Sequence, residues 1–396
     1  MNILHVIANN NSKFHGAIVG TFEKTSHHNK YVCIVDDGED VKCDDSDRVV
    51  RIKKSECGFL WDKEDFDAYM FHPLYVNTYD WVLQIPRDKI VIASSWGADL
   101  YYPQANCPPL LSVELYRGET RKAIRSINER RSSLLDRVRR TVGEVYHYNR
   151  NKERSEAEQK QLSIKLEKQQ KVLQRINLWA TVLPEEFGML KSKYGITAKP
   201  FPFHYAVWNL SLDCERPVWE DTNCILLGNS ADPTNNHIDL VRLMQKRGII
   251  DRYSLYIPLA YGDEKYKNWL KTHLGLKADK FIAQDELIPI EEYRKILKSC
   301  RVAVFGHLRQ QALGNIIENM LQGKKVFLYK DSMAYKYFIG RGAIVYNIEQ
   351  DLCLNEIDTQ LTEKQIEINK KACDEFAVEN VVSRVGSALS SFKRTP

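Results

Sequence analysis

From residue 224 to residue 346 the sequence alternates short apolar runs with amphipathic stretches, and this alternation restricts the fold more than any other feature. The apolar runs are Cys224–Leu227, Tyr253–Leu259, Phe281–Ala283, Val302–Phe305, Lys325–Tyr329 and Ala343–Tyr346. The stretches between them have the length and spacing of helices: Asn236–Lys246, Lys265–His273, Ile290–Ser299, Leu313–Gln322 and Ser332–Phe338. Repeated strand–helix units of this kind predict a doubly wound, parallel α/β sheet.

The first 113 residues carry a second series of short apolar runs, separated by polar stretches that contain Gly and Asp. The runs are Ile3–Ala8, Tyr31–Val35, Val49–Ile52, Trp81–Ile85 and Ile90–Ser94. Continuous runs of this length are typical of parallel strands that are covered on both faces. Phe14–Thr25 is long enough for a crossover helix, so this region predicts a Rossmann-like α/β domain.

Residues 114–180 differ from both neighbouring regions because they are dense in Arg, Lys, Glu, Gln and Leu. Between Arg117 and Arg175 there are 17 Lys/Arg and 8 Asp/Glu, a net charge of +9 in a chain of net charge +5. Apolar residues recur at helical spacing in two stripes: Leu134, Leu135, Val138, Val142 and Val145, then Leu162, Ile164, Leu166, Val172, Leu173 and Ile176. We expect two long helices or a helical hairpin. Either the basic face of these helices meets an anionic membrane surface, or the segment is a solvated helical insertion packed on the core.

These regions predict an α/β protein of two Rossmann-like domains with a basic helical insertion between them. The expected boundaries are 1–113, 114–180 and 181–360, and helices at Glu363–Phe376 and Val378–Phe392 pack back towards the first domain. The nine cysteines form no Cys-x-x-Cys pair, which argues against a zinc site or a disulfide framework. This usage fits a reducing compartment. No apolar run reaches the ~18 residues of a membrane-spanning helix. Met1–Ala8 is expected to be a buried strand rather than a signal peptide, so the predicted location is cytoplasmic.

In open α/β sheets, ligands bind beyond the carboxyl ends of the strands, so the loops after these strands are candidate sites. Gly228, Asn229 and Ser230 follow the first strand of the second sheet. Gly228 lets the backbone approach a ligand closely, and the helix N-terminus beyond it suits a diphosphate. Asp232 is interpreted as a helix cap rather than a ligand. Tyr261, after the next strand, either stacks on a base or sugar or belongs to a strand-ending turn.

The loop after Val302–Phe305 leads directly into a predicted helix and carries most of the remaining candidates. Arg309 presents a planar fork of N–H groups that matches phosphate. Gly314 and Asn315 lie where the N–H groups of the helix would face that phosphate. Two side-chain amides, Gln310 and Gln311, complete the predicted ligand-binding set.

Four side chains of the first region are candidates for a second subsite. His15 lies in the segment after the first strand, and His72 precedes Pro73. Trp96, Gly97 and Asp99 follow the fifth predicted strand. The indole suits packing on a sugar face, while Asp99 accepts hydroxyl hydrogen bonds or acts as a base. Core packing is the alternative for Trp96, and a structural role is the alternative for His72.

Three motifs together resemble glycosyltransferase family 56, the TDP-N-acetylfucosamine:lipid II N-acetylfucosaminyltransferases. They are WGADLY at 96–101, ILLGNSADPTNNH at 225–237 and RQQALG at 309–314. Their order and approximate spacing agree with the family, and the match covers most of both predicted α/β domains. The resemblance implies the GT-B fold, which consists of two Rossmann-like domains.

The resemblance also implies a function. The donor is expected to be a dTDP-linked 4-acetamido-4,6-dideoxygalactose and the acceptor a lipid-linked saccharide, with retention at the anomeric carbon. No metal or other cofactor is expected, since GT-B enzymes neutralise the leaving diphosphate with helix dipoles and basic side chains. His15, Asp99 and Arg309 are the implied catalytic residues, and Trp96, Gly97 and His72 the acceptor-binding residues. The implied donor-binding residues are Gly228, Asn229, Ser230, Tyr261, Arg309, Gln310, Gln311, Gly314, Asn315 and Glu318.

Two features depart from what the resemblance implies. Many retaining GT-B enzymes have a Glu that holds the donor ribose on the helix predicted here at Leu313–Gln322. That Glu lies five residues before a Gly. Glu318 has that spacing to Gly323, but the second Glu of the motif, eight residues earlier, is replaced by Gln310. The segment 114–180 is also longer and more basic than the family leads us to expect. This difference indicates a different acceptor or a different mode of membrane binding.

Other interpretations remain open at this point. One is a GT-B transferase with another nucleotide-sugar donor or acceptor, and another is a non-catalytic scaffold that uses the basic helices. Nucleic acid is not an expected partner because the helices lack interleaved aromatic residues. A metal-dependent GT-A enzyme would use Asp45-Ser46-Asp47, an Asp-x-Asp match in an acidic polar loop.

Overall fold

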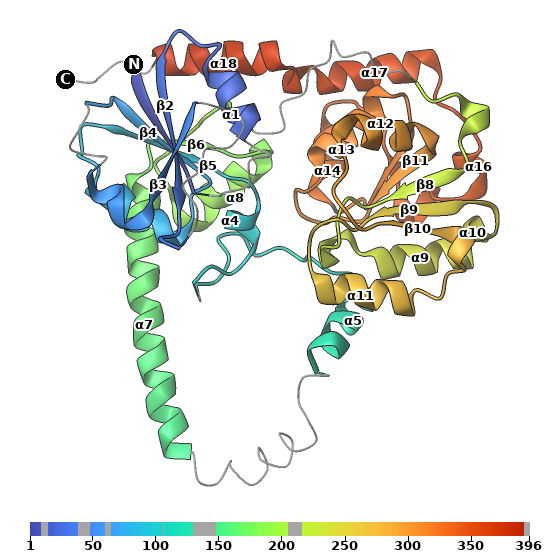
Figure 1. Ribbon diagram of the computed structural model, residues 1–396, viewed down its shortest axis with the longest axis horizontal. Coiled ribbons are helices and arrows are strands. Elements are labelled where there is room, and N and C mark those ends of the chain that lie inside the picture. Colours follow the sequence, from blue (N-terminus) through green and yellow to red (C-terminus); the bar gives the residue numbers. More distant parts are fainter. Residues whose placement is uncertain are drawn as a thin grey trace. The chain divides into compact units, whose positions relative to one another are not determined.

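The computed structural model describes residues 1–8, 15–38, 48–59, 65–105, 107–129, 148–204 and 216–391 (Figure 1). The chain divides into two compact units. Unit 1 consists of Met1–Ser112, Arg150–Asn209 and Glu375–Pro396, and unit 2 of Val113–Asn149 and Leu210–Asp374. The segment 181–209, which we expected in the second domain, therefore belongs to unit 1.

Unit 1 is built on a parallel sheet of seven strands in the order β3-β2-β1-β4-β5-β6-β7. The strands are β1 (Asn2–Ile7), β2 (His28–Val35), β3 (Val49–Lys53), β4 (Ala68–His72), β5 (Ile90–Ser94), β6 (Leu178–Ala180) and β7 (Lys199–Pro200). The last five residues of β1 and all five of β4 are buried, as expected for central strands with both faces covered. The predicted Rossmann-like sheet is thus confirmed.

One predicted strand of unit 1 was wrong. Trp81–Ile85 does not form a strand, because Tyr79–Gln84 is a helix, α3. Tyr79, Val82 and Ile85 are buried while Leu83 is 39% exposed, a three-residue period that belongs to a helix. The strand in its place is β4, whose five consecutive buried residues we had not recognised.

Helices from distant parts of the sequence cover the unit 1 sheet. They are α1 (His15–Phe22), α4 (Ala98–Tyr101), α7 (Tyr148–Arg175), α8 (Pro184–Tyr194) and α18 (Val378–Ser391), with the 3₁₀ helices η2 (Lys54–Phe59) and η3 (Val76–Thr78). α18 packs beside α1, and the two lie side by side in Figure 1. Val381, Val385 and Leu389 recur every four residues on α18 and join the core beside Ile18 and Phe22. The last helix of the chain is therefore part of the first unit.

The predicted helical insertion is present as α5 (Gly118–Glu129) and α7. Its first apolar stripe, at 134–145, lies outside the described residues. The second stripe is buried only at its end, where Val172, Leu173 and Ile176 join the core. Ile164 is 57% exposed and Leu166 37%, so α7 reaches the core only after these positions.

Unit 2 contains a parallel sheet of six strands in the order β10-β9-β8-β11-β12-β13. The strands are β8 (Cys224–Leu227), β9 (Ser254–Pro258), β10 (Phe281–Gln284), β11 (Cys300–Phe305), β12 (Val326–Leu328) and β13 (Tyr346–Asn347). Five of the six predicted runs form these strands, and the sixth, Ala343–Tyr346, overlaps β13 only at Tyr346. The order reverses direction between β8 and β11, which is the switch point where doubly wound sheets bind ligands.

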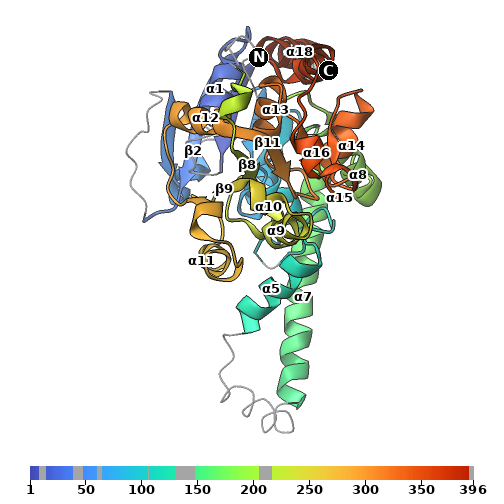
Figure 2. The same cartoon turned by 90° about the vertical axis from the view of Figure 1, so that its right-hand side faces the viewer.

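Helices cover both faces of this sheet. The helices after β8 and β9, α9 (His237–Lys246), α10 (Ile249–Arg252) and α11 (Glu264–His273), lie on one face, and α12 (Ile290–Ser299) and α13 (Leu313–Leu321) on the other (Figure 1). The remaining helices are α14 (Met333–Gly340), α15 (Ile348–Asp351), α16 (Leu354–Ile357) and α17 (Glu363–Cys373), with the 3₁₀ helix η5 at Pro233–Asn235. α5 packs against α9 and α11, below them in Figure 2. The first described stretch of the insertion therefore belongs to unit 2.

Candidate functional site

Side chains join three loops at the carboxyl edge of the unit 2 sheet. Asn229 follows β8, Tyr261 follows β9, and His307 and Gln311 follow β11. Asn229 Nδ2 donates to the Tyr261 hydroxyl over 2.8 Å, and His307 Nε2 lies 3.0 Å from Asn229 Oδ1. Gln311 Nε2 donates to the same oxygen over 3.3 Å. Three residues predicted separately, Asn229, Tyr261 and Gln311, are therefore in direct contact.

Two glycines let these loops approach each other closely. Gly228 has a φ of +71°, and a Cβ there would lie 2.5 Å from Asn235 Oδ1 and 2.8 Å from His237 Nε2. A Cβ on Gly306 would lie 2.3 Å from the carbonyl oxygen of Asn235. Real Cβ atoms do not come this close to other atoms, so any other residue would push the loops apart. Gly228 is therefore needed for the packing of its own loop, while the predicted approach of its backbone to a ligand stays a prediction.

Asn235 and His307 hold the loops together, and sequence reasoning did not select either of them. Asn235 Oδ1 accepts the N–H of Asn229 at 2.9 Å and lies 2.8 Å from His307 Nε2. Since Nε2 faces two amide oxygens, it carries the hydrogen of the imidazole. Burial lowers the pKa of His307 well below its usual value, so the ring is neutral. Its Nδ1 is then a buried hydrogen-bond acceptor without a partner among the described residues.

The turn after β8 uses its own polar side chains. Asp232 Oδ1 accepts the N–H of Thr234 at 2.9 Å, so the interpretation of Asp232 as a helix cap is confirmed. Asn235 Nδ2 donates to the Ser230 carbonyl over 3.1 Å and to Ser230 Oγ over 3.2 Å. Ser230 is 1% exposed. Its side chain therefore supports the turn, and a ligand contact through Ser230 stays a prediction.

Arg309 lies within this group of loops and is 7% exposed. Nη1 donates to the Gln310 carbonyl over 2.7 Å, and Nη2 lies 3.9 Å from Asp232 Oδ2. A guanidinium held at both ends has a fixed orientation, which is what planar recognition of phosphate requires.

The two glutamines next to Arg309 differ in what they contact. Gln311 is tied down, because Thr234 Oγ1 donates to its Oε1 over 2.5 Å and its amide reaches Asn229. Gln310 is 1% exposed, and neither atom of its amide has a hydrogen-bond partner in the described part of the chain. An unpaired buried amide costs about 1–3 kcal/mol. A ligand that both donates and accepts hydrogen bonds would remove this cost.

α13 begins at Leu313, so Gly314 and Asn315 occupy its first turn as predicted. Asn315 Oδ1 accepts the Tyr293 hydroxyl at 2.9 Å. Glu318, one turn further on, is 3% exposed and pairs with Arg294 Nε at 3.1 Å. Burial is the main cause that raises the pKa of Glu318, against the opposing charge of Arg294. The carboxylate is thus used by a structural ion pair, and its ribose role stays a prediction.

In unit 1, Asp99 folds back on the turn that precedes it. Its Oδ1 accepts the N–H groups of Trp96 at 2.8 Å and Gly97 at 3.0 Å. Gly97 has a φ of 98°, a conformation that strongly favours glycine. Asp99 is 1% exposed, and burial raises its pKa to about 6. A side-chain hydrogen bond from Ser95 acts against this rise in pKa, and no described residue lies in good hydrogen-bond geometry to Oδ2.

His72 ends β4 at the carboxyl edge of the unit 1 sheet and is fully buried. Its ring centre lies 6.5 Å from that of Trp96, so two predicted acceptor residues are neighbours. The charge of His15 is among the causes that lower the pKa of His72, after burial and the charge of His5. His15, at the start of α1, is 3% exposed. Three of the predicted residues of unit 1 thus gather at one edge.

Two residues behind His72, the buried His5 and the half-buried Asn29, fix its proton. Asn29 donates both amide hydrogens to the carbonyls of Phe22 and His27, each at 3.0 Å, so its Oδ1 faces His5 Nε2 at 3.1 Å as an acceptor. A neutral His5 then carries its hydrogen on Nε2 and accepts with Nδ1 from His72 Nε2, 3.0 Å away. The lone pair of His72 is therefore on Nδ1, which has no partner in the described residues.

No group of three or more His, Cys, Asp or Glu in the described ranges is arranged to hold a metal ion. The Asp45-Ser46-Asp47 match of the GT-A alternative lies outside those ranges. Likewise, none of the described helices is long and apolar enough to cross a membrane.

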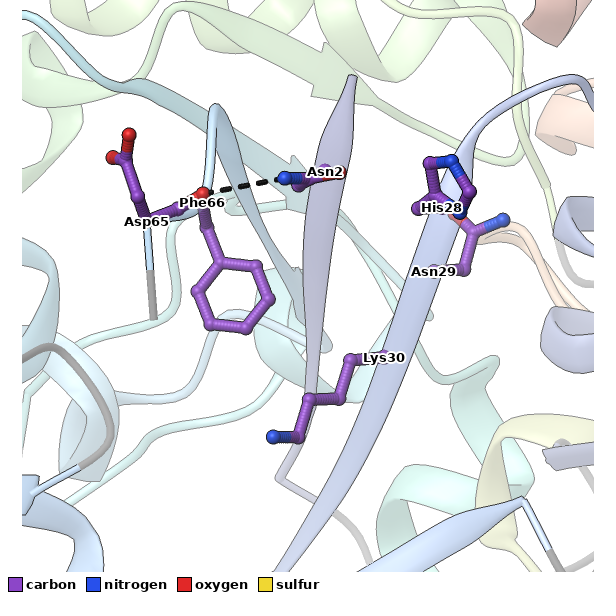
Figure 3. A pocket seen from close by; sticks show the side chains of 6 residues that line it. All are labelled: Asn2, His28, Asn29, Lys30, Asp65 and Phe66. Carbon is purple, nitrogen blue, oxygen red and sulfur yellow. Dashed lines mark hydrogen bonds between the residues drawn. The ribbon is translucent and has the colours of Figure 1, made fainter. Parts of the chain in front are cut away.

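A hollow of about 420 Å³ opens at the opposite edge of the unit 1 sheet. It is lined by residues at the amino ends of β1, β2 and β4: Asn2, His28, Asn29, Lys30, Asp65 and Phe66 (Figure 3). Doubly wound sheets bind ligands at the carboxyl ends of their strands. This hollow is therefore separate from the candidate site.

Comparison with known proteins agrees with this geometry. The sucrose-phosphate synthase of Thermosynechococcus elongatus superposes with a TM-score of 0.62 at 12% identity, over 98% of both chains. Anabaena HepE in complex with UDP gives 0.60 at 11% identity, over 99% of this chain and 100% of the other. The lipopolysaccharide outer core galactosyltransferase WaaB gives 0.58 at 10% identity, over 99% of both. These similarities show the GT-B fold, as predicted.

The sequence of unit 2 gives the more specific match. Residues 201–375 match the family described as 4-alpha-L-fucosyltransferase, glycosyl transferase group 56. The matched range contains the loops after β8, β9 and β11 that form the candidate site. Over these residues the chain is similar to glycosyltransferase family 56, and it is a glycosyltransferase of the GT-B fold.

Proposed function

We propose that this glycosyltransferase moves 4-acetamido-4,6-dideoxygalactose from a dTDP-sugar donor to a lipid-linked saccharide during surface-polysaccharide assembly. The family match supports the class of transferred sugar, a deoxyhexose. The main support for donor binding in unit 2 is the group of loops after β8, β9 and β11, whose side chains contact each other at the switch point of the sheet. Arg309 lies among these loops. The scaffold alternative is set aside, because the matched family consists of transferases.

The donor diphosphate is proposed to bind at these loops, near Arg309 and the first turn of α13. HepE, a protein of similar fold, has been crystallised with UDP, which supports a nucleotide at this kind of sheet. Charge grows on the diphosphate as the bond to the sugar breaks. A preorganised guanidinium and helix N–H groups stabilise that charge without reorganising. The proposed reaction therefore needs no metal, and addition of EDTA is expected to leave turnover unchanged.

The acceptor side is proposed to involve unit 1. Trp96, Gly97 and His72 would contact the acceptor saccharide, and Asp99 or His15 would accept its proton. The stereochemical outcome is proposed to be retention, with the leaving phosphate itself able to take the proton. Nuclear magnetic resonance of the product measures the anomeric configuration directly, and an inverted product would rule out retention.

The first test is thermal stabilisation of the purified protein by dTDP, UDP, GDP, ADP and CMP. A ligand at a hundredfold excess over its Kd stabilises the folded state by about 2.7 kcal/mol. Stabilisation by dTDP alone is the expected result. A shift with a different nucleotide would replace the proposed donor by another nucleotide sugar, which is the remaining alternative.

The basic segment is proposed to dock the enzyme on the inner face of the cytoplasmic membrane, beside its lipid-linked acceptor. Each Lys or Arg near an anionic surface contributes about 1 kcal/mol. Sedimentation with vesicles of phosphatidylglycerol or phosphatidylcholine tests this: binding to the anionic vesicles only, weakened by salt, is expected. Equal recovery with both vesicle types would contradict it.

A further inference from the structure

The segment just before α5 is bound tightly to the loops of the candidate site. Asn236, between the loop after β8 and α9, is fully buried. Its Nδ2 donates to the carbonyls of Leu115 at 3.2 Å and Gly306 at 2.7 Å, and its Oδ1 accepts the N–H of Arg117 at 2.7 Å. One amide thus ties residues 115 and 117 to the loops after both β8 and β11.

Further contacts hold the same segment from the other side. Asp239, in the first turn of α9, accepts the N–H groups of Glu119 and Thr120, both at 2.9 Å, and so caps α5. The Arg117 guanidinium lies 4.3 Å from the centre of the Tyr329 ring and donates to Asp331 Oδ1 at 2.6 Å. Residues 115–120 are therefore held in place on unit 2 by hydrogen bonds to its loops and to α9.

Tyr116 lies between the two pinned backbone groups and is half-buried. Burial is the main cause that raises its pKa above its usual value, and the charges of Asp232, Arg309 and Asp263 also act on it. Asn236 binds the residues on both sides of Tyr116 and also the carbonyl of Gly306 in the loop after β11, so Tyr116 lies at the same carboxyl edge. Its hydroxyl keeps its proton at neutral pH and makes no hydrogen bond to another described residue.

The two nearby carboxylates are already used by their own helices. Asp232 caps η5, and Asp263 Oδ1 accepts the N–H of Tyr266 at 2.8 Å to cap α11. Arg309 is the remaining charged neighbour, and it favours an anionic ligand. A protonated phenol facing such a ligand has one strong contact to offer, an O–H donated to a phosphate oxygen.

We propose that Tyr116 is a further donor-binding residue, whose hydroxyl donates a hydrogen bond to the diphosphate of the nucleotide sugar. This inference rests on the proposed function and names a residue outside the matched family range. It also makes the segment that leads from unit 1 into α5 part of the donor site.

The test is titration of dTDP, and of the other four nucleotides, into the full-length protein and its Tyr116→Phe variant. Phe keeps the ring and removes only the hydroxyl, so the Kd of the bound nucleotide is expected to rise about tenfold. Tyr335→Phe, on α14, is the matched control and should bind as the wild type does. Equal melting temperatures of the three proteins confirm that the variants fold.

The possible outcomes separate the two proposals. If the wild type binds a nucleotide and Tyr116→Phe binds it with the same Kd, the role of Tyr116 is wrong while the donor site stands. If the wild type binds none of the five nucleotides, both proposals fail. A Kd for the diphosphate that rises while the much weaker Kd for thymidine stays constant identifies the phosphate as the contact.

Discussion

His5 Nδ1 lies 3.0 Å from His72 Nε2 in the centre of the unit 1 sheet, and both rings are fully buried. The pair stays neutral because burial lowers the pKa of His5 to about 4 and that of His72 well below its usual value. His5 thereby controls which nitrogen of His72 carries the hydrogen. A residue in the middle of a strand thus determines the chemistry that His72 offers at the edge of the sheet.

These histidines predict that unit 1 loses stability on acidification. Their folded-state pKa values lie below the unfolded value near 6.5, so the unfolded chain binds more protons as the pH falls. The contribution is fully present above pH 6.5 and is lost from there towards pH 4, at about 1.4 kcal/mol per pH unit for each histidine. His204, whose pKa burial lowers to about 4, adds to the loss. Asp99, with a pKa raised to about 6, opposes it between pH 6 and 4.

Urea unfolding at pH 7.5, 6 and 5 measures the net effect. Because three histidines oppose one aspartate, the free energy of unfolding should fall over this range. The His5→Phe variant is expected to be less stable at pH 7.5, because it leaves His72 Nε2 without its acceptor. Its stability should depend less steeply on pH. A variant that keeps the full wild-type pH dependence would show that His5 is not among the groups responsible.

A second prediction concerns the glycine of the donor loop. Gly228→Ala would place a Cβ 2.5 Å from Asn235 Oδ1 with φ at +71°. We expect the free energy of unfolding to fall by roughly 2–5 kcal/mol, from the strained φ and the steric overlap together. Nucleotide affinity should also fall, because Asn235 positions Asn229 and His307.

Gly248→Ala is the matched control for this change. Gly248 has nearly the same φ, +67°, but the nearest atom to its Cβ would be Asp251 Oδ2 at 3.6 Å. It should therefore cost only about 1–2 kcal/mol, from φ alone, with nucleotide affinity unchanged. Equal effects of the two variants on both measurements would mean that the close approach of the loops is unimportant.

The strands of unit 2 could be predicted from the sequence because each is a continuous apolar run followed by an amphipathic helix. In unit 1 this pattern fails, because a run predicted as a strand forms the helix α3 and the strand β4 was not predicted. Trp81–Ile85 is as apolar as a strand, and only its burial at three-residue intervals reveals a helix. Periodicity in so short a run does not separate the two structures.

The site was predicted in part for a similar reason. Asn229, Tyr261, Gln311 and Arg309 directly follow predicted strands, so the rule for doubly wound sheets selects them. Asn235 and Asn236 act through hydrogen bonds to residues as far as 121 positions away, for example Leu115 with Asn236. Tyr116 is held near the site only because its neighbours Leu115 and Arg117 are bound to Asn236. Such pairs have no periodicity or spacing that a single sequence displays. His307 lies in a loop that was selected, but its role depends on two amides of another loop.

A third prediction tests Arg309. The Arg309→Ala variant should lower kcat by roughly 100–1,000-fold, the usual effect of removing one group that stabilises developing charge. Arg309→Lys should recover only part of this loss, because a lysine presents no planar fork. Turnover with a dTDP-sugar is the measurement, with the melting temperature as the check on folding. Near-normal turnover of Arg309→Ala would remove it from the reaction.

The last prediction concerns Asp99, whose pKa burial raises to about 6. If Asp99 accepts the proton of the acceptor, it must be ionised, so kcat/KM should rise with pH through about 6 and level off above. Asp99→Asn keeps an oxygen that can accept the N–H groups of Trp96 and Gly97, so the turn is preserved. It should lower turnover by about 100–10,000-fold, the range for loss of a general base, and remove the rise near pH 6. A wild-type profile that is flat from pH 5 to 8, or a variant that keeps the rise, would assign Asp99 to the turn alone. In that case the leaving phosphate remains as the proposed proton acceptor.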